Sequence, residues 1–181
     1  MREIKFRGKK FNNEWVYGSL IIGEHERSSD GQKFDVAFIV KDLPCAEEPN
    51  GMWEAKMKRV KVGTIGQFTT LRDKNGKDIY EGDILRVKEY ENALMKTFSD
   101  DPNRFDFFTL EEIKAEYLAE YVSPVVWDEG GFQISSNGKY FDMWCASLFG
   151  DMKRSSPIFE FEVIGNIYDN PEIEMHVVKL R

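Results

Sequence analysis

The chain has few of the residues that metal sites and disulfide frameworks need, with two cysteines and two histidines among 181 residues. They are Cys45, Cys145, His25 and His176, and no two of them fall within the short spacings that anchor a structural metal site. Two widely separated cysteines, without a secretory leader before them, are typical of a reducing cytoplasm. We therefore expect no metal, no cofactor and a cytoplasmic location.

Long apolar runs and the common enzyme fingerprints are missing as well. The longest apolar runs are far shorter than the ~20 residues that span a bilayer, so we expect no membrane partner. The sequence contains no Gly-x-Ser-x-Gly, no His-Glu-x-x-His and no phosphate-binding glycine loop. The net charge of −7 argues against a general binder of phosphate backbones, although it leaves room for one local basic patch.

The main pattern in the sequence is the alternation of polar and apolar residues that is typical of β-strands. Glu3–Arg7 alternates polar and apolar residues, which places Ile4 and Phe6 on one face and Lys5 and Arg7 on the other. The stretches Trp15–Ile22 and Val36–Val40 are apolar on both faces and are predicted to be buried strands, joined by a polar loop from Gly23 to Lys33. A mainly β fold with short helices follows.

Three turn signals organise the second half of the chain. Asn75-Gly76 predicts a tight hairpin, because both residues tolerate positive φ angles. Glu81-Gly82-Asp83 predicts a second turn that leads directly into the alternating stretch 84–88, and Asp128–Gly131 predicts a third hairpin. A turn followed at once by an alternating strand is common in small closed barrels.

One segment predicts a helix. Residues 88–120 carry a net charge of −5, and Thr109 and Glu112 have the spacing of a capping box. Apolar residues recur at helical spacing up to Tyr121, and Pro124 ends the pattern. The sequence therefore predicts a helical insertion at about 88–121.

Two basic runs are candidates for binding nucleic acid, because cations bind phosphates and aromatic rings stack on unpaired bases. One lies near the start of the chain and the other lies beside Trp53. The candidate residues are Lys5, Arg7, Trp53, Lys56, Lys58 and Arg59. The simpler interpretation is that these cations lie on the solvated faces of strands.

A metal-dependent nuclease is a further alternative. Glu54-Ala55-Lys56 lies downstream of Asp42, and an acidic residue two positions before a lysine recurs in such sites. In a chain with 32 acidic residues this triplet is expected by chance, so the pattern has little specificity.

Several sequence blocks, in order along the chain, resemble the YopX family of bacteriophage and prophage proteins. They are Met1–Gly8, Trp15–Gly18, Val62–Thr69, Leu71–Ile84, Val126–Phe132 and Val163–Glu172. The family has a Gly-Leu step where this chain has Thr70-Leu71. The resemblance implies a phage or prophage origin and a C-terminal small SH3-type β-barrel, but it implies no reaction and no catalytic residues.

These expectations combine into a β-rich N-terminal part, 1–61, followed by a small-barrel domain, 62–181, that carries the helical insertion. The function that fits best is a non-enzymatic binding module with a protein or nucleic-acid partner, and self-association into a homo-oligomer is compatible with it. The alternatives are a metal-dependent enzyme acting on nucleic acid and a minor virion assembly factor.

Overall fold

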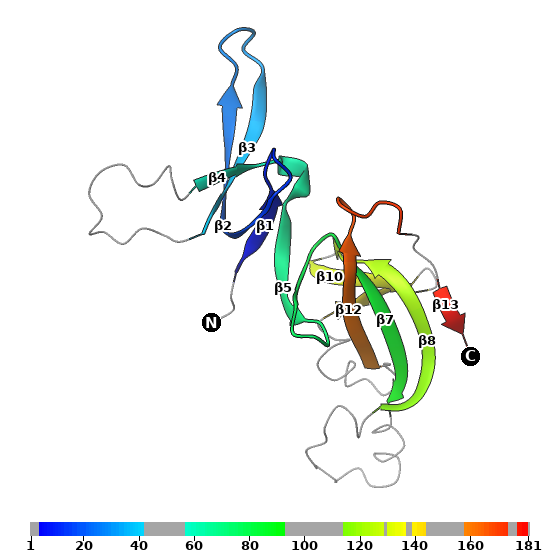
Figure 1. Cartoon of the computed structure of the whole chain (residues 1–181). Helices are drawn as coiled ribbons and strands as arrows, with labels where there is room; N and C mark the ends of the chain where they lie inside the picture. The colour runs from blue at the N-terminus through cyan, green and yellow to red at the C-terminus, as the bar shows by residue number, and fades with distance from the viewer. Residues whose placement is uncertain are drawn as a thin grey trace, which may run out of the picture. The chain divides into compact units, whose positions relative to one another are not determined.

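The computed structural model describes residues 4–41, 57–92, 114–128, 130–136, 139–143, 158–173 and 177–180. Over these residues the protein is mainly β, with the 3-10 turn η1 (Val62–Thr64) after the fourth strand (Figure 1). The chain divides into two compact units, Met1–Thr70 and Leu71–Arg181. None of the helical residues in these ranges belongs to a segment long and apolar enough to cross a membrane. The predicted β class is confirmed, whereas the division into an N-terminal part, 1–61, and a domain, 62–181, stays a prediction.

Unit 1 contributes five strands of a six-stranded antiparallel sheet, in the order β4-β3-β2-β1-β5, and the sixth strand, β6 (Asp78–Tyr80), follows β5 in this sheet and belongs to unit 2. The strands of unit 1 are β1 (Phe6–Lys9), β2 (Trp15–Glu26), β3 (Lys33–Val40), β4 (Met57–Val60) and β5 (Gly66–Arg72), whose last two residues belong to unit 2. The alternation read from the sequence is confirmed in β1, because Phe6 packs against the core of this unit while Lys5 and Arg7 lie over aromatic rings on the other face. The core is formed by Ala37, Ile39 and Val60, with Phe6, Val16, Leu20 and Ile65 packed against them.

The sheet of unit 1 curls so that its edge strand β4 approaches β1. Directly after β4, the backbone N–H of Lys61 donates to the carbonyl oxygen of Lys9 at the end of β1, at 2.8 Å. A Cβ atom at Gly8 would lie 2.9 Å from Val60 Cγ2, closer than real Cβ contacts. Gly8 therefore permits the close approach of β1 and β4.

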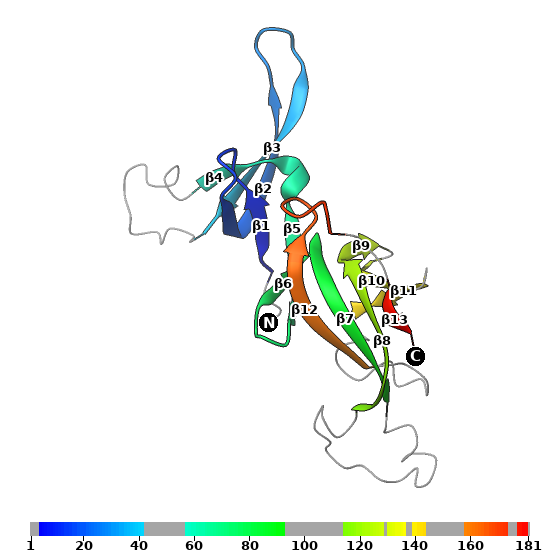
Figure 2. The ribbon, with the colours of Figure 1, turned by 45° about the vertical axis from the view of Figure 1, so that its right-hand side comes forward.

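The distal halves of β2 and β3 form a two-stranded ribbon, which we call the arm (residues 21–36). It projects from the sheet in both views of the ribbon (Figures 1 and 2). The prediction that Trp15–Ile22 is a buried strand is therefore wrong for Ile21 and Ile22, which are 46% and 57% exposed, and also for Tyr17, which is 46% exposed. The predicted polar loop is also shorter than expected, because residues 23–26 and Lys33 pair as strands and the turn spans only 27–32.

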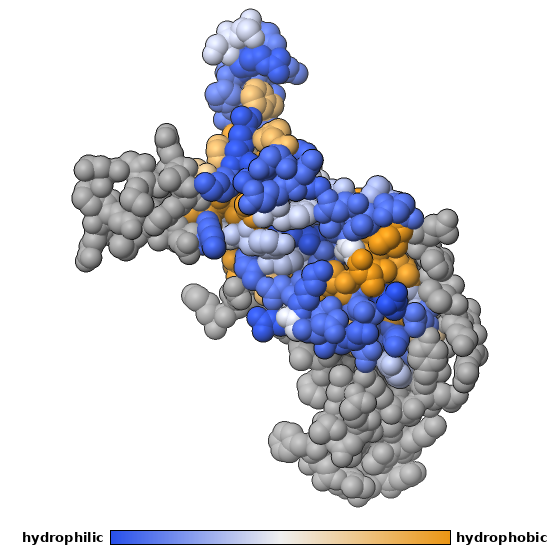
Figure 3. All heavy atoms as spheres, in the orientation of Figure 1, coloured by the Kyte–Doolittle hydropathy of each residue, from blue (hydrophilic) through white to orange (hydrophobic). Residues whose placement is uncertain are grey.

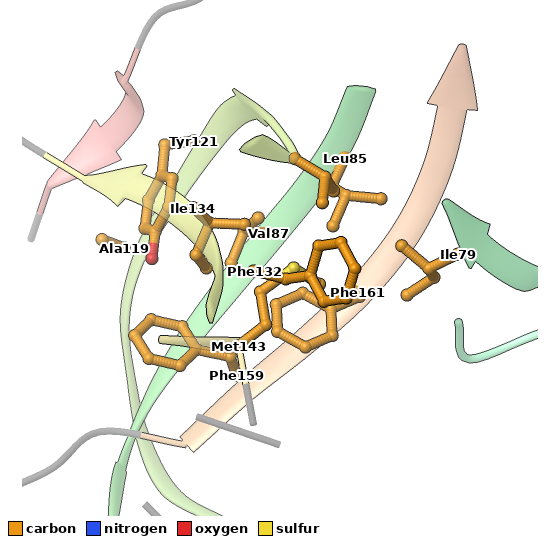
Figure 4. Packing of buried hydrophobic residues seen from close by; sticks show 11 residues of the cluster. Ile79, Leu85, Val87, Ala119, Tyr121, Phe132, Ile134, Met143, Phe159 and Phe161 are labelled. Atoms are coloured by element: carbon orange, nitrogen blue, oxygen red, sulfur yellow. The ribbon is translucent and has the colours of Figure 1, made fainter. Parts of the chain in front are cut away.

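Unit 2 contains two antiparallel sheets, with strand orders β12-β7-β8-β13 and β11-β10-β9. The strands are β6 (Asp78–Tyr80), β7 (Asp83–Asn92), β8 (Lys114–Pro124), β9 (Val126–Asp128), β10 (Gly131–Ser136), β11 (Lys139–Asp142), β12 (Ile158–Asn166) and β13 (Val177–Leu180). Side chains of both sheets converge on one core, shown in Figure 4. Its buried members are Ile79, Leu85, Val87, Ala119, Tyr121, Val125, Phe132, Ile134, Met143, Phe159 and Phe161.

The predicted turns are confirmed. Gly76 has a φ of 80° between β5 and β6, and Gly76 N–H donates to the carbonyl of Asp73 at 2.9 Å. Gly82 has a φ of 79°, and its N–H donates to Val125 O while its carbonyl accepts from Ile167 N–H. The hairpin between β9 and β10 also forms, with Gly130 at a φ of 84°.

Two finer expectations are wrong for the described residues. The helix predicted to run to Tyr121 is a strand from Lys114 onward, since β8 pairs with β7 along its length and with β13 near its end. Thr109 and Glu112 lie outside the described residues. The expected SH3-type barrel is not found either, because among the described residues both sheets of unit 2 have open ends.

Candidate nucleic-acid interface

The turn between β1 and β2 and the end of β4 lie together and form a cluster that we call the basic tip. It comprises Lys10, Phe11, Lys58, Arg59 and Lys61. The turn closes through Lys10 N–H to Glu14 O at 2.8 Å and Asn13 N–H to Lys10 O at 3.0 Å. Lys61 joins β4 to it, because Lys61 Nζ donates to Asn13 Oδ1 at 2.9 Å.

An exposed aromatic ring lies among these cations. Phe11 is 64% exposed, and the guanidinium of Arg59 lies 5.6 Å from its ring centroid. Lys58 and Arg59 are both exposed and, as consecutive strand residues, point to opposite faces of β4. The tip therefore offers cations and one ring surface to solvent.

Glu14 carries the one carboxylate of residues 4–19 and 57–70. Lys10 Nζ lies 2.5 Å from its Oε2, and Asn12 Nδ2 donates to the same oxygen. The hydrogen bond from Lys10, then that from Asn12 and the positive charges of Lys10 and Lys58, hold the pKa of Glu14 below its ordinary value. A carboxylate that is stabilised in its charged form indicates a locally positive surface.

A second row of cations runs along one face of β1. Lys5 Nζ lies 4.8 Å from the ring centroid of Phe68, and the guanidinium of Arg7 lies 4.8 Å from that of Trp15. Lys9 Nζ lies 5.8 Å from the same tryptophan ring. Arg7 is only 5% exposed, so its contact with Trp15 stabilises the sheet and presents little charge to a partner.

Positive charge is concentrated in this part of unit 1, although the chain as a whole is acidic. Residues 4–19 and 57–70 contain seven lysines and arginines against one carboxylate, that of Glu14. The whole chain carries 25 basic and 32 acidic residues. A local patch of this kind is what an acidic protein needs if it is to bind a polyanion.

The structure thus brings together some of the residues that the sequence singled out. Lys58 and Arg59 belong to the basic tip, while Lys5 and Arg7 share one face of β1. Trp53 and Lys56 lie outside the described residues, as do Asp42 and Glu54 of the nuclease alternative. Sequence reasoning missed Phe11 and Trp15, although an aromatic residue in the polar turn Lys9-Lys10-Phe11-Asn12-Asn13 was a usable signal.

Carboxylates in the described part of the chain have structural roles or lie in solvent. No group of three or more His, Cys, Asp or Glu side chains that could hold a metal ion occurs among the described residues. The buried carboxylate of Asp83 accepts from Tyr80 N–H at 2.8 Å, which closes the turn before β7. Asp128 is exposed on β9, beside the β9–β10 turn.

Comparison with known protein families identifies the family of this chain. A family model described as YopX protein matches residues 5–173, which include most of both units. The chain matches none of the curated proteins with which it was compared.

Proposed function

The chain belongs to the YopX family, and from this premise we propose that it is a phage- or prophage-derived, non-enzymatic module that binds single-stranded nucleic acid in the cytoplasm of the bacterial host. The observation that carries the proposal is the basic tip. There, exposed Arg59 lies over the exposed ring of Phe11, and exposed Lys58 lies on the opposite face of β4, in a region with seven cations and one carboxylate.

The chemistry of the tip favours a single strand over a duplex. Cations attract the phosphate backbone of either form, whereas an aromatic ring stacks only on a base that is not already stacked in a helix. Phe11 offers such a ring, and Tyr17, which is 46% exposed on the strand that follows the turn, offers a second. Base stacking contributes about 1–3 kcal/mol per base, so Phe11 is the side chain expected to distinguish the two forms.

The negative charge of the remainder of the chain opposes binding to phosphates outside the tip. Residues 71–181 carry a net charge of −9, whereas residues 1–70 carry +2. Phosphate attraction is therefore confined to a few cations, so affinity should fall steeply with salt.

Fluorescence anisotropy tests the proposal with labelled single-stranded and duplex DNA and RNA across a salt series. We expect the parent protein to bind single strands more tightly than duplexes. The double variant Lys58→Glu/Arg59→Glu should bind at least tenfold more weakly, with a salt slope that is smaller by about 1.4, as expected for two lost phosphate contacts. Phe11→Ala should reduce the preference for single strands without changing the salt slope.

The matched control is Arg27→Glu/Lys33→Glu, which reverses two exposed cations of the arm and gives the same net charge. Equal loss of binding in both double variants would contradict a site at the tip. The same samples with magnesium and manganese test the enzyme alternative, which metal-dependent cleavage products would support. Neither binding nor cleavage at micromolar protein would overturn the proposal in favour of a protein-binding or virion assembly role.

A further inference from the structure

The arm is a hydrogen-bonded two-stranded ribbon that nothing in the described part of the chain covers. Residues 21–26 are all exposed, on both faces. The polar and aromatic contacts of its distal end lie within the arm: His25 packs edge-on to Phe34 at 5.3 Å, Lys33 Nζ lies 2.7 Å from Glu24 Oε1, and Arg27 pairs with Asp30 at 3.0 Å. Two strands alone are marginally stable in water, so a ribbon this exposed indicates a docking element.

One face of the arm is acidic. The register places Glu24 directly opposite Asp35 and Glu26 opposite Lys33, so these four side chains share a face with Ile22. Three carboxylates and a single lysine leave an excess of two negative charges on that face. Like charges directly opposite each other are destabilising, and a partner that supplies cations would remove this cost.

The basic tip has the complementary character. It presents Arg59 over the ring of Phe11, Lys58 on the opposite face of β4 and Lys61 beside the β1–β2 turn, and Val62 follows at 39% exposed. The acidic face of the arm presents one large apolar side chain, Ile22, which is 57% exposed. Each surface thus combines charges of one sign with exposed apolar area, and the signs are opposite.

Within one copy β4 pairs with Ala37–Val40 of β3, whereas the charged residues of the acidic face of the arm lie beyond these positions. The two strands of the arm continue the hydrogen-bonded sheet, which fixes the direction in which the arm projects (Figures 1 and 2). Figure 3 shows the visible side of the arm as mainly hydrophilic toward its end, with apolar side chains nearer the sheet. Both surfaces are present once in every copy, so two copies can satisfy both contacts at once around a two-fold axis.

We propose that the acidic face of the arm in one copy docks on the basic tip of a second copy, and the reverse, to form a homodimer. The dimer covers the tip, so nucleic acid and the second copy's arm compete for it. Dimerisation is measured without nucleic acid, so its failure is distinguishable from failure of the proposed function.

Sedimentation velocity on the full chain tests the dimer. At low salt the parent should sediment as a concentration-dependent dimer, and at about 1 M salt, where the screening length is about 3 Å, it should sediment as a monomer. The arm variant Glu26→Lys/Asp35→Lys and the tip variant Lys58→Glu/Arg59→Glu should each be monomeric at low salt. Glu172→Lys, at an exposed carboxylate of unit 2, is the control and should remain dimeric.

Mixing the two charge-reversed variants gives the decisive result. In the mixture the reversed arm of one variant faces the reversed tip of the other, and the unchanged arm faces the unchanged tip, so both contacts become attractive again. A dimer that forms only in the mixture supports the proposal. A parent that is monomeric at low salt, or variants that remain dimeric alone, would overturn it, as would a mixture that stays monomeric while both variants retain the parental far-UV circular dichroism.

Discussion

Asp73 shows how one buried carboxylate connects a hairpin to the sheet beside it. Its Oδ1 accepts from the backbone N–H of Asn75 at 2.8 Å and of Lys77 at 2.9 Å, and its Oδ2 accepts from Val163 N–H at 3.1 Å. Burial alone would raise the pKa of Asp73, but the three backbone donors outweigh burial and hold the pKa below its ordinary value of 3.8. The charged form is therefore favoured by folding.

We predict that Asp73→Asn lowers the free energy of unfolding at neutral pH by about 1–3 kcal/mol, as expected for lost hydrogen bonds to a charged group. Because the folded-state pKa is depressed, this contribution is present above the ordinary pKa and lost as pH falls through the folded-state value. Urea denaturation of parent and variant between pH 7 and pH 3 measures the difference. A difference that stays constant over this range would contradict the prediction.

Glu89 is a control for Asp73, because its pKa is shifted in the opposite direction. It lies in register between Phe159 and Ala119, on the side of β7 that faces the core, and burial raises its pKa above the ordinary value of 4.5. A raised carboxyl pKa favours folding below the ordinary value, and this contribution is lost as pH rises through the folded-state value. Glu89→Gln should therefore stabilise the protein at pH 7 and have no effect near pH 3.

Thr70 has a backbone conformation that its side chain opposes. Its φ is 72°, in the left-handed region that β-branched residues rarely adopt, and its hydroxyl donates to the carbonyl of Thr69. The resemblance implies glycine at this position, and glycine adopts this φ without strain.

We predict that Thr70→Gly raises the free energy of unfolding by about 1 kcal/mol, because relief of strain exceeds the added entropy of the unfolded chain. Thermal unfolding measures the effect. Ser19→Gly, at an exposed strand position where φ is not positive, is the control and should lower the melting temperature. A Thr70→Gly variant that melts below the parent would show that the hydroxyl contact outweighs the strain.

At the scale of elements, β8 shows why local patterns are insufficient. Its buried positions alternate as Ala119, Tyr121 and Ser123, which is strand periodicity. The glutamates and the spacing of the apolar residues before it favour a helix locally, but the pairing partners that decide the structure, β7 and β13, are distant in sequence. Turns such as Asn75-Gly76 were predicted correctly because their geometry depends on adjacent residues alone.

Because β8 contributes residues to the core of unit 2, deleting the segment predicted to be a helical insertion should unfold this unit. Replacing 88–121 with a short turn would remove Ala119 and Tyr121, which are 3% and 1% exposed in the core of unit 2. We expect this variant to lose cooperative thermal unfolding of unit 2 and the near-ultraviolet circular dichroism of its aromatic residues. An insertion outside the core would instead leave both signals intact.

A truncation of the arm is the matched control for that deletion. Replacing Glu24–Lys33 with Asn-Gly removes mainly exposed residues and none of the core of unit 1. It should leave the unfolding transition in place, so a loss of cooperativity in both variants would point to a general effect of chain shortening.

At the scale of the whole molecule, the two units differ in how much apolar surface they bury. Among the described residues, the core of unit 2 contains eleven buried residues, whereas that of unit 1 contains three, with four partly buried side chains around them. Small cores give marginal stability.

The basic tip could be predicted only in part from the sequence. The proximity of Phe11 and Arg59 depends on the curl of the sheet of unit 1, which local sequence patterns do not reveal.

We predict that a fragment of residues 71–181 folds alone with a cooperative thermal transition, and that a fragment of residues 1–70 melts at a lower temperature or without a resolved transition. Circular dichroism of the two fragments measures this. A fragment 1–70 that melts above fragment 71–181 would contradict the prediction.

The hydrogen bonds of Lys61 affect how the tip would bind a ligand. Its backbone N–H to Lys9 and its ammonium group to Asn13 fix the β1–β2 turn and the end of β4 relative to each other before any partner arrives. A surface that is preorganised in this way loses little conformational entropy on association. Calorimetric titration of the protein with single-stranded nucleic acid should then show no large entropic penalty from ordering of the β1–β2 turn. The variant Lys61→Met should introduce such a penalty.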